Sequence, residues 1–447
     1  MEEKIVTRRE ELETYFNKYP DVPREVIIKE DVLRNGLDFT EAALKAGEGR
    51  HTKTYHLFTT DQAATDQAYQ ERAIKIPEKI EIWGGLYDLR QYTSIRARLT
   101  PDSPYVVDAV DGVLMLCERG KSVHVPLALI REYPPRPKYY AKSFEDGTPY
   151  SNVVQLVHGN RGQPRIVAML VCHHWGPHQE CKFCDINQNV KLRKQRGSLK
   201  VPKSYQDPKQ AGEVMKEVVL GENWGPGKPN YYLLTGGTIA GKFEGMSEED
   251  FYMQYVEAVN ESLGDIWRMD CDLQTQPKPK KVCQRWYEAG VKFHEPNYEV
   301  WDKRLFGIIC PGKDRVVGRD EWIRLTIEEV DVFGVGNVIP GFVAGVEMAR
   351  PWGFETVDEA IESNRDGFEF FMSHGVIPRP LSWCVEAGSA LRGHPQLPLD
   401  YYVRLDMVWY ETWKKYRLPQ DMGGRGIRAF GTGRNVYPNN ASRDMGV

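Results

Sequence analysis

A dense group of cysteines and histidines directly after a buried strand constrains the fold of this chain most. Three of its eight cysteines stand there together with three histidines, as Cys172, His173, His174, His178, Cys181 and Cys184. The run before them, residues 166–171 (IVAMLV), is apolar throughout and partly β-branched. Such a run is typical of a strand buried on both faces of a parallel sheet. The cysteines are therefore expected in the loop at the carboxyl end of that strand, where α/β barrels build their active sites.

The spacing of the cysteines bears on the kind of metal centre. Three closely spaced thiolates, with the aromatic Phe183 before the last one, suit a [4Fe-4S] cluster that leaves one iron open. A structural zinc site normally takes four ligands in two short pairs. The alternative to the cluster is a zinc knot of Cys172, Cys181, Cys184 and one of the three histidines.

Strand patterns alternate with helix patterns between residues 151 and 417. The expected strands are residues 166–171, 231–234, 267–273, 291–295, 330–335 and 376–383. Helix starts lie between them, for example at Asp207, which precedes Pro208, and at Ser247. This order predicts an α/β fold, namely a partial (β/α)6 barrel of the TIM type with right-handed crossovers.

The segments on either side of the barrel pattern have a different character. Residues 1–150 begin with helix patterns, the first opened by a capping box at Thr7 and Glu10, and continue with strand patterns. We expect an N-terminal α+β extension that serves as a lid or as the contact surface of a homo-oligomer, with a role in substrate choice as the alternative. Residues 418–447 are rich in Gly and Arg and indicate an irregular C-terminal tail, either a solvated end or a segment folded over the barrel mouth.

Composition narrows the classes of function. The formal net charge of -4 gives no polyanion-binding signal, so a nucleic-acid partner is not expected. The first residues lack the basic and apolar regions of a signal peptide, and no run of about 18 apolar residues occurs. We therefore expect a cytoplasmic protein without a membrane partner. Eight cysteines in 447 residues, three of them in one loop, favour metal chemistry in a reducing compartment over a disulfide framework.

The cysteine loop, set after the first strand of such a barrel, resembles the cluster loop of the radical S-adenosylmethionine (SAM) superfamily. The usual spacing there is Cys-x3-Cys-x2-Cys, whereas this chain has Cys-x8-Cys-x2-Cys. The resemblance implies that Cys172, Cys181 and Cys184 hold a [4Fe-4S] cluster whose fourth iron binds SAM. It also implies that an electron donor such as flavodoxin or ferredoxin reduces the cluster. Reductive cleavage of SAM then gives a 5′-deoxyadenosyl radical, which abstracts hydrogen from the substrate.

The same resemblance assigns SAM contacts to later loops. Gly236, Gly237 and Thr238 follow the second strand, where the superfamily has a Gly-Gly-Glu motif whose backbone holds the SAM amino group. Because Thr238 replaces the acid, only the backbone part of that role carries over. Further contacts come from a resemblance to the biotin synthase branch. They are Glu295 and Asn297 for the ribose, Arg304 for the carboxylate, and Gly336, Val338 and Ile339 for the adenine. The alternative for Arg304 is a solvated arginine on a helix surface.

Several residues are candidates for contact with the substrate. Gln274, just beyond the third strand, is expected to reach SAM or substrate. Cys271 lies within that strand, either facing the lumen as a radical partner or buried as a small apolar thiol. The histidines of the cysteine loop are expected to donate hydrogen bonds to the cluster, to shield it or to contact substrate. The alternative for them is hydrogen bonding to the backbone.

Two motifs that the sequence lacks narrow the range of reactions that we expect. It has no Asp-x-His-x-x-Gly cobalamin signature and no second compact set of cysteines. We therefore expect hydrogen abstraction from a small organic substrate, with carbon-skeleton change or group insertion, in cofactor or natural-product biosynthesis. One alternative is methyl or sulfur transfer by the same core. The other is a non-enzymatic barrel protein with structural zinc.

Overall fold

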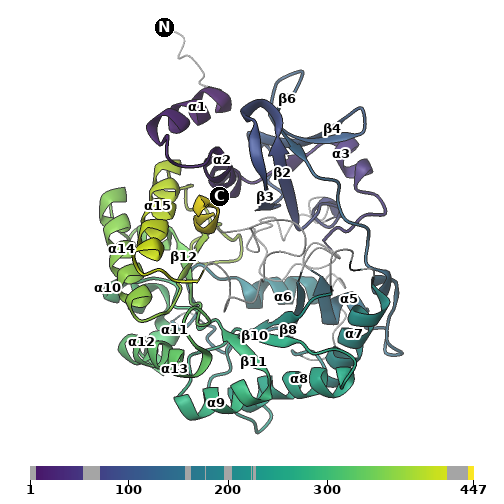
Figure 1. The fold of residues 1–447 in the computed structure, drawn as a ribbon, viewed down its shortest axis with the longest axis vertical. Coiled ribbons are helices and arrows are strands. Elements are labelled where there is room, and N and C mark those ends of the chain that lie inside the picture. Colours follow the sequence, from purple (N-terminus) through teal and green to yellow (C-terminus); the bar gives the residue numbers. More distant parts are fainter. Residues whose placement is uncertain are drawn as a thin grey trace.

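A six-stranded sheet in the N-terminal part, and a five-stranded and a two-stranded sheet in the barrel, organise the chain (Figure 1). Each of these two parts has its own hydrophobic core. The computed structural model describes residues 7–53, 71–156, 163–176, 178–195, 204–222, 224, 228–419 and 441–446. Within these residues no helix combines the length and the apolarity that crossing a membrane requires.

Six parallel strands follow one another in chain order to form a partial barrel. They are β8 (Pro164–Met169), β9 (Tyr231–Gly236), β10 (Asp270–Leu273), β11 (Val291–His294), β12 (Gly341–Ala344) and β13 (Arg379–Ser382). The first four pair in sequence, and β12 pairs with β13. Parallel bridges from His294 to Val338 and from Glu299 to Phe342 join the two groups. Strand β7 (Val154–Leu156) closes the edge at β8 in the antiparallel sense. The α/β fold with a partial (β/α)6 barrel is therefore confirmed.

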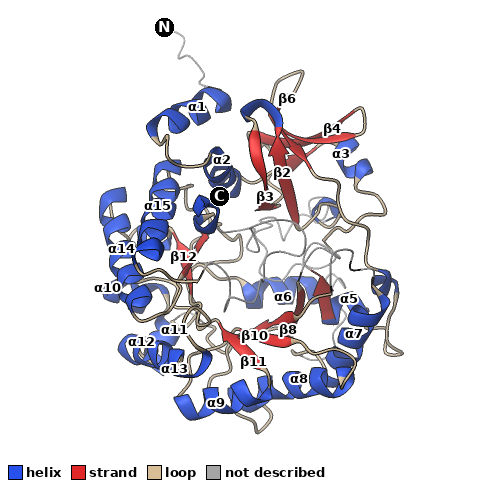
Figure 2. Ribbon diagram, in the orientation of Figure 1, coloured by secondary structure: helices blue, strands red, loops and turns tan. Residues whose placement is uncertain are grey.

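Helices cover the outside of these strands (Figure 2). They are α7 (Pro208–Gly221), α8 (Glu248–Leu263), α9 (Lys280–Ala289), α10 (Lys303–Ile309), α11 (Pro311–Val316), α12 (Arg319–Glu328), α13 (Val330–Phe333), α14 (Val357–Ser373) and α15 (Leu399–Lys415). Asp207 and Ser247 cap α7 and α8 as predicted, and each side chain accepts a backbone N–H of the first turn. Helix α6 (Ile186–Gln195) instead packs Ile186 and Val190 on Val167 and Leu170, beside the cysteines.

The prediction of the fifth strand at residues 330–335 is wrong. Residues Val330–Phe333 form helix α13, which ends at Gly334 with φ of 91°, and the fifth strand is β12. The apolar residues Ile327, Val330 and Phe333 recur every three positions and pack on the barrel core, which is a helical pattern. A short apolar run does not distinguish a strand from such a helical turn.

The N-terminal part is an α+β layer around the second core. Its helices are α1 (Arg8–Lys18), α2 (Arg24–Asn35) and α3 (Glu41–Ala46). The strands are β1 (Asp38–Phe39), β2 (Lys79–Gly84), β3 (Leu89–Arg96), β4 (Tyr105–Val110), β5 (Val113–Glu118) and β6 (Val125–Ile130), in the sheet order β1-β4-β5-β6-β2-β3. The predicted capping box at Thr7 and Glu10 is present. Helix α5 (Tyr150–Val153) and the 3-10 turns η1 (Gly85–Tyr87), η2 (Lys138–Ala141) and η4 (Val346–Met348) are short connections.

The end of the chain packs into this second core. The turn η6 (Ser442–Gly446) follows Ala441, which is fully buried, and the Asp444 carboxylate lies 3.0 Å from the Lys29 ammonium on α2. The hydroxyl of Ser442 donates to Asp406 on α15. Residues 441–446 are thus no solvated end, while residues 420–440 of the predicted tail lie outside the described residues. Domain boundaries at 150 and 417 stay predictions.

Candidate functional site

The cysteine loop is fixed by backbone contacts at both of its ends. The N–H of Cys184 donates to the carbonyl of Cys181 over 2.9 Å, so these two cysteines share a tight turn. At the other end the Asn187 amide accepts from the N–H of Cys172 at 2.6 Å and donates to its carbonyl at 3.0 Å. Asn187 lies in the first turn of α6, directly after the cysteines. The loop therefore leaves β8 and closes on the helix that follows it.

The three thiols lie near enough to one another to shift each other's ionisation. Burial raises the pKa of Cys172 to about 11, and the Cys181 thiolate adds to this effect. Burial, then Cys181, also raises the pKa of Cys184 well above its ordinary value. The pKa of Cys181 alone is lowered, first by a hydrogen bond from the thiol of Cys310, against burial, and then by the Lys313 cation. Cys181 is therefore the thiol that ionises first.

Residues 309–313 form a second wall along the cysteine loop. The N–H of Lys182 donates to Ile309 at 2.9 Å, and that of Gly312 donates to Gln179 at 3.0 Å. A Cβ on Gly312 would lie 2.4 Å from the Gln179 carbonyl, so only glycine permits this approach. The sequence predicted no role for Cys310 or Lys313 at the cysteine loop, because nothing local relates them to a loop more than a hundred residues earlier.

Among the residues that the structure describes, no group of three or more His, Cys, Asp or Glu side chains is placed so that it could hold a metal ion. The zinc knot and the [4Fe-4S] cluster therefore both stay predictions for the cysteine loop.

The three histidines of the loop have different surroundings. His174 is buried, and neither ring nitrogen makes a hydrogen bond of regular geometry with a described residue, although the ring interacts with the Gln276 side chain. Burial, then the Lys313 cation, lowers its pKa to about 4, so the imidazole is neutral. The His173 ring meets Phe243 edge to face at 5.6 Å, and its backbone N–H donates to the carbonyl of Thr238 at 2.8 Å. His178 is exposed. Backbone bonding of the ring, the alternative interpretation, therefore does not describe His174.

The glycine turn after β9 lies directly against the cysteine loop. A Cβ on Gly237 would lie 2.0 Å from the Val171 carbonyl, and one on Gly236 would lie 2.6 Å from the Met169 nitrogen. The carbonyl of Gly237 accepts from the Tyr252 hydroxyl at 3.0 Å. Close backbone approach is thus the reason for glycine here, and it brings the two predicted loops into contact. The SAM amino-group role of Gly236, Gly237 and Thr238 stays a prediction.

A buried polar network lies in the lumen beneath these loops. Glu295 accepts two hydrogen bonds from the Arg379 guanidinium, one of 2.6 Å, and a third of 2.8 Å from the Gln274 amide. The Thr235 hydroxyl donates to Gln274 in turn. Asp272 lies beside them, and its Oδ1 has no hydrogen-bond partner among the described residues. Burial, then Glu295, raises the pKa of Asp272 well above its ordinary value. Thr235, Asp272, Gln274 and Glu295 lie at the carboxyl ends of β9, β10 and β11, whereas Arg379 is the first residue of β13.

Two of the five residues of this network were predicted from the sequence. Gln274 and Glu295 were candidates, and the structure brings them together. Arg379 and Asp272 were missed, although a charged residue within an expected parallel strand is itself a signal, because such strands are buried on both faces. The predicted ribose role of Glu295 has to be reconciled with a carboxylate that already accepts three hydrogen bonds.

The other residues that were predicted to contact SAM make contacts within the protein. Asn297 accepts from the N–H of Gly341 at 2.8 Å and so holds β12. Val338 and Ile339 are fully buried between β11 and β13, and Gly336, with φ of 81°, packs on Pro419. Arg304 is exposed on α10 and donates to the Trp352 carbonyl, which is the surface position that the alternative interpretation expects. Their roles toward SAM stay predictions.

Cys271 faces the helices. Side chains alternate along a strand, and Asp272 points into the lumen, so Cys271 points outward. It is buried in the barrel core beside Tyr232, and burial raises its pKa well above the ordinary value. The small apolar thiol of the alternative interpretation describes it better than a lumen-facing radical partner.

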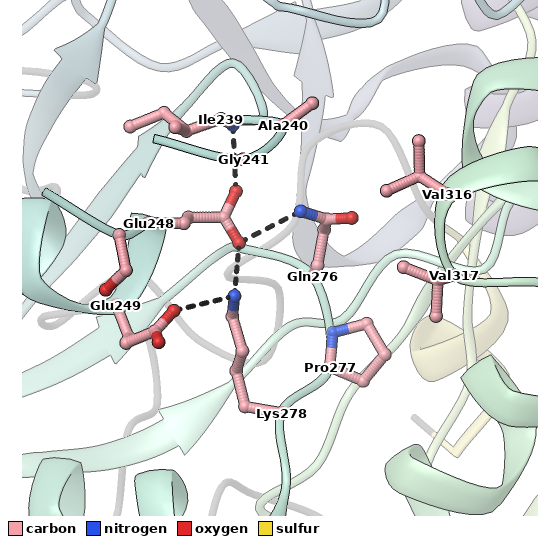
Figure 3. A pocket seen from close by; sticks show the side chains of 11 residues that line it. Ile239, Ala240, Gly241, Glu248, Glu249, Gln276, Pro277, Lys278, Val316 and Val317 are labelled. Atoms are coloured by element: carbon pink, nitrogen blue, oxygen red, sulfur yellow. Dashed lines mark hydrogen bonds and ion pairs between the residues drawn. The ribbon is translucent and has the colours of Figure 1, made fainter. Parts of the chain in front are cut away.

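A cavity of about 270 Å³ opens between the loops after β9 and β10 (Figure 3). The residues that line it are Ile239, Ala240, Gly241, Ser247, Glu248, Glu249, Gln276, Pro277, Lys278, Val316 and Val317. Ile239 follows Thr238, whose carbonyl binds the cysteine loop, so the cavity and the cysteines share one wall. The sequence predicted a structural role for one lining residue, the helix cap Ser247, and a binding role for none of them.

Comparisons with known proteins give matches among solved structures alone. No protein-family model and no curated protein matches the sequence. Methylornithine synthase (PylB) is similar with a TM-score of 0.37 and 16% identity, over 61% of this chain and 72% of that one. The FeFe-hydrogenase maturase HydG from Carboxydothermus hydrogenoformans has a TM-score of 0.33 and 12% identity, over 58% and 54%. OxsB, a cobalamin-dependent S-adenosylmethionine radical enzyme, has a TM-score of 0.32 and 12% identity, over 61% and 38%.

Proposed function

We propose that this chain is a radical SAM enzyme in which Cys172, Cys181 and Cys184 hold a [4Fe-4S] cluster. The observation that carries the proposal is a fixed three-thiol loop at the carboxyl end of the first of six parallel strands, with the glycine turn of the second strand against it. When bound, the cluster supplies the electron that cleaves SAM to a radical able to abstract hydrogen from a substrate.

The residues present fit such a group. Thiolates are the protein ligands of iron–sulfur clusters, and the three thiols are neither fully buried nor paired in disulfides. Cys181 is held toward its thiolate form by Cys310 and Lys313. The Cys172 and Cys184 thiols are protonated in the free protein, so they release protons when metal binds. Asn187 fixes the backbone of Cys172 by accepting a hydrogen bond from its N–H.

The rest of the barrel would position the reactants and exclude water. Glu295 accepts from both Arg379 and Gln274 and so fixes their orientation inside the lumen, which gives the kind of pre-organised polar surface that catalysis needs. We place SAM between the cysteine loop and this network, with Gln274 within reach of SAM or substrate. A small organic substrate, biosynthesis in the cytoplasm, and flavodoxin or ferredoxin as electron donor complete the proposal.

Product analysis tests it. The full chain is purified anaerobically, reconstituted with iron and sulfide, reduced with dithionite and incubated with SAM. We expect 5′-deoxyadenosine and methionine from the wild type and none from Cys172→Ala, Cys181→Ala or Cys184→Ala. Cys117→Ala is the matched control, because Cys117 is buried in the N-terminal sheet.

Two outcomes would count against the proposal. S-adenosylhomocysteine in place of deoxyadenosine would indicate methyl transfer. A colourless protein with stoichiometric zinc would indicate the structural zinc site of the alternative interpretation.

A further inference from the structure

We propose that the cavity between the loops after β9 and β10 binds the ammonium end of an aliphatic amine. Resting on the proposed function, this inference names the substrate class as amine-bearing small molecules. The inference rests on the charges of the residues that line the cavity, on a buried hydrogen-bond acceptor among them, and on the apolar walls of the cavity.

The ionised groups of the lining leave one excess negative charge. Glu248 accepts from the Ile239 N–H at 3.0 Å, and the ammonium of Lys278 lies 3.1 Å from Glu248 and 3.0 Å from Glu249. One lysine thus faces two carboxylates. Although burial opposes it, the two glutamates raise the pKa of Lys278, so the lysine stays charged. An anionic ligand would meet this excess negative charge, whereas an ammonium group would neutralise it.

The Gln276 side chain supplies a buried acceptor that makes no hydrogen bond of regular geometry with a described residue, although the His174 ring lies near enough to interact with Gln276. Its amide nitrogen donates to Glu248 at 3.1 Å, which fixes the orientation of the amide. The amide oxygen therefore lies on the far side, toward Val316 and Val317 (Figure 3). Gln276 is only 6% exposed, and this oxygen has no hydrogen-bond partner among the described residues. A buried acceptor left without a donor is costly, so a donor from a ligand is the natural partner.

Buried hydrogen bonds hold the loop that carries Gln276 and Lys278. The Thr275 hydroxyl lies 2.9 Å from His294 Nε2, and His294 Nδ1 lies 2.7 Å from Glu329. Glu329 also accepts from the Lys278 N–H at 2.9 Å. His294 and Glu329 are fully buried. The acceptor is thus presented by a rigid loop, which lowers the ordering cost of binding.

The other walls of the cavity and its volume indicate which kind of molecule the ammonium group belongs to. Ile239, Pro277, Val316 and Val317 give the cavity an apolar side that suits methylene groups. Its volume of about 270 Å³ lies just below the usual range of small-molecule sites. An aliphatic chain with an ammonium end fits both properties.

Calorimetric titration with three probes of equal length tests the inference on the full chain. The probes are 1,5-diaminopentane, 1,5-pentanediol and glutarate, which differ in charge. We expect the diamine to bind with one site per chain, the diol at least about tenfold more weakly, and glutarate not at all, since tenfold corresponds to one modest polar contact.

Variants locate the site. Glu249→Gln removes the excess charge at a partly exposed position and should weaken diamine binding roughly tenfold, as should Gln276→Leu, which removes the acceptor. Glu257→Gln is the control, because Glu257 is exposed on the same helix and does not line the cavity. Melting temperatures verify that each variant is folded.

Three results would overturn the inference: no diamine binding, glutarate binding as well as the diamine, or diamine binding that both variants leave unchanged. The titration requires no SAM cleavage. A protein that forms deoxyadenosine but binds no amine refutes this inference alone, and one that binds the diamine but never cleaves SAM refutes the proposed function alone.

Discussion

At the scale of single residues, the cysteine loop depends on one amide. Asn187 both accepts from and donates to the backbone of Cys172, and so replaces the regular hydrogen bonding that β8 loses when it ends. A cluster ligand has to be placed to a fraction of an ångström, so we regard Asn187 as a positioning residue.

Asn187→Ala should therefore loosen Cys172. We expect a loss of about 1–3 kcal/mol of stability from the unsatisfied backbone groups, and a reconstituted cluster that releases iron faster. Iron release to a chelator, measured beside the melting temperature, checks this. Gln188→Ala, one residue further on α6, is the control and should retain its iron like the wild type.

The ion pair in the lumen gives a second prediction at this scale. Arg379→Ala leaves Glu295 buried without its cation, which should cost about 3–5 kcal/mol. The double change Arg379→Met with Glu295→Leu removes both charges and should recover much of that loss. Chemical denaturation of Arg379→Met, of Glu295→Leu and of the double variant measures the coupling between the two charges. Additive losses would show that the two charges do not interact.

Which residues the sequence could predict follows from the range of their contacts. The three cysteines and Gly237 were found because their spacing and their place after a strand are local signals. Arg379 was missed because its partner Glu295 lies 84 positions away, and no periodicity relates the two. The contact of Cys310 with Cys181 was not predicted for the same reason.

At the scale of elements, the order of strands and helices was predictable and their edges were less so. Five of the six barrel strands were expected where they occur, because apolar β-branched runs between capped helices are a strong signal. The fifth was placed on α13, since β12 is short and begins at Gly341. The loop contacts that build the site depend on close packing between elements, for which glycine is the one local sign.

Gly237→Ala tests that packing. A Cβ there would lie 2.0 Å from the Val171 carbonyl and 2.7 Å from Cys172 Cα, so the turn after β9 and the cysteine loop must separate. We expect destabilisation of about 1–3 kcal/mol and a lower cluster content. Gly221→Ala, at the end of α7, meets the flexible tip of Glu217 and should be neutral or stabilising. Equal behaviour of the two variants in thermal melting and iron analysis would refute the packing argument.

At the scale of the whole molecule, the end of the chain joins the N-terminal layer to the barrel. Residues 441–446 lie on α2 and α15, where Lys29 faces Asp444, and Ser382 of β13 donates to Glu30 at 2.7 Å. Burial raises the pKa of Glu30 to about 7, against Ser382 and Lys29, and Asp444 adds to the rise. Burial and Glu30 likewise raise the pKa of Asp406 well above its ordinary value.

This junction should weaken as pH rises. Between the ordinary pKa of 4.5 and about 7, the folded protein holds a proton on Glu30 that the unfolded chain has released. The free energy of unfolding therefore falls across that window, by up to about 1.4 kcal/mol per pH unit from this group. Glu30→Gln should match the wild type near about pH 5 and melt at a higher temperature near about pH 8. Glu48→Gln, an exposed site, is the control. A variant that is no more stable at the higher pH contradicts this account.

The central claim is that the cysteine loop carries a [4Fe-4S] cluster with one iron open to SAM, and electron paramagnetic resonance of the reduced, reconstituted protein tests it most directly. We predict about four irons per chain and a cluster signal that changes when SAM is added. Cys310→Ser should keep that signal, and Cys181→Ala should lose it. A protein that binds zinc in place of iron, or a cluster signal that SAM leaves unchanged, would contradict the claim.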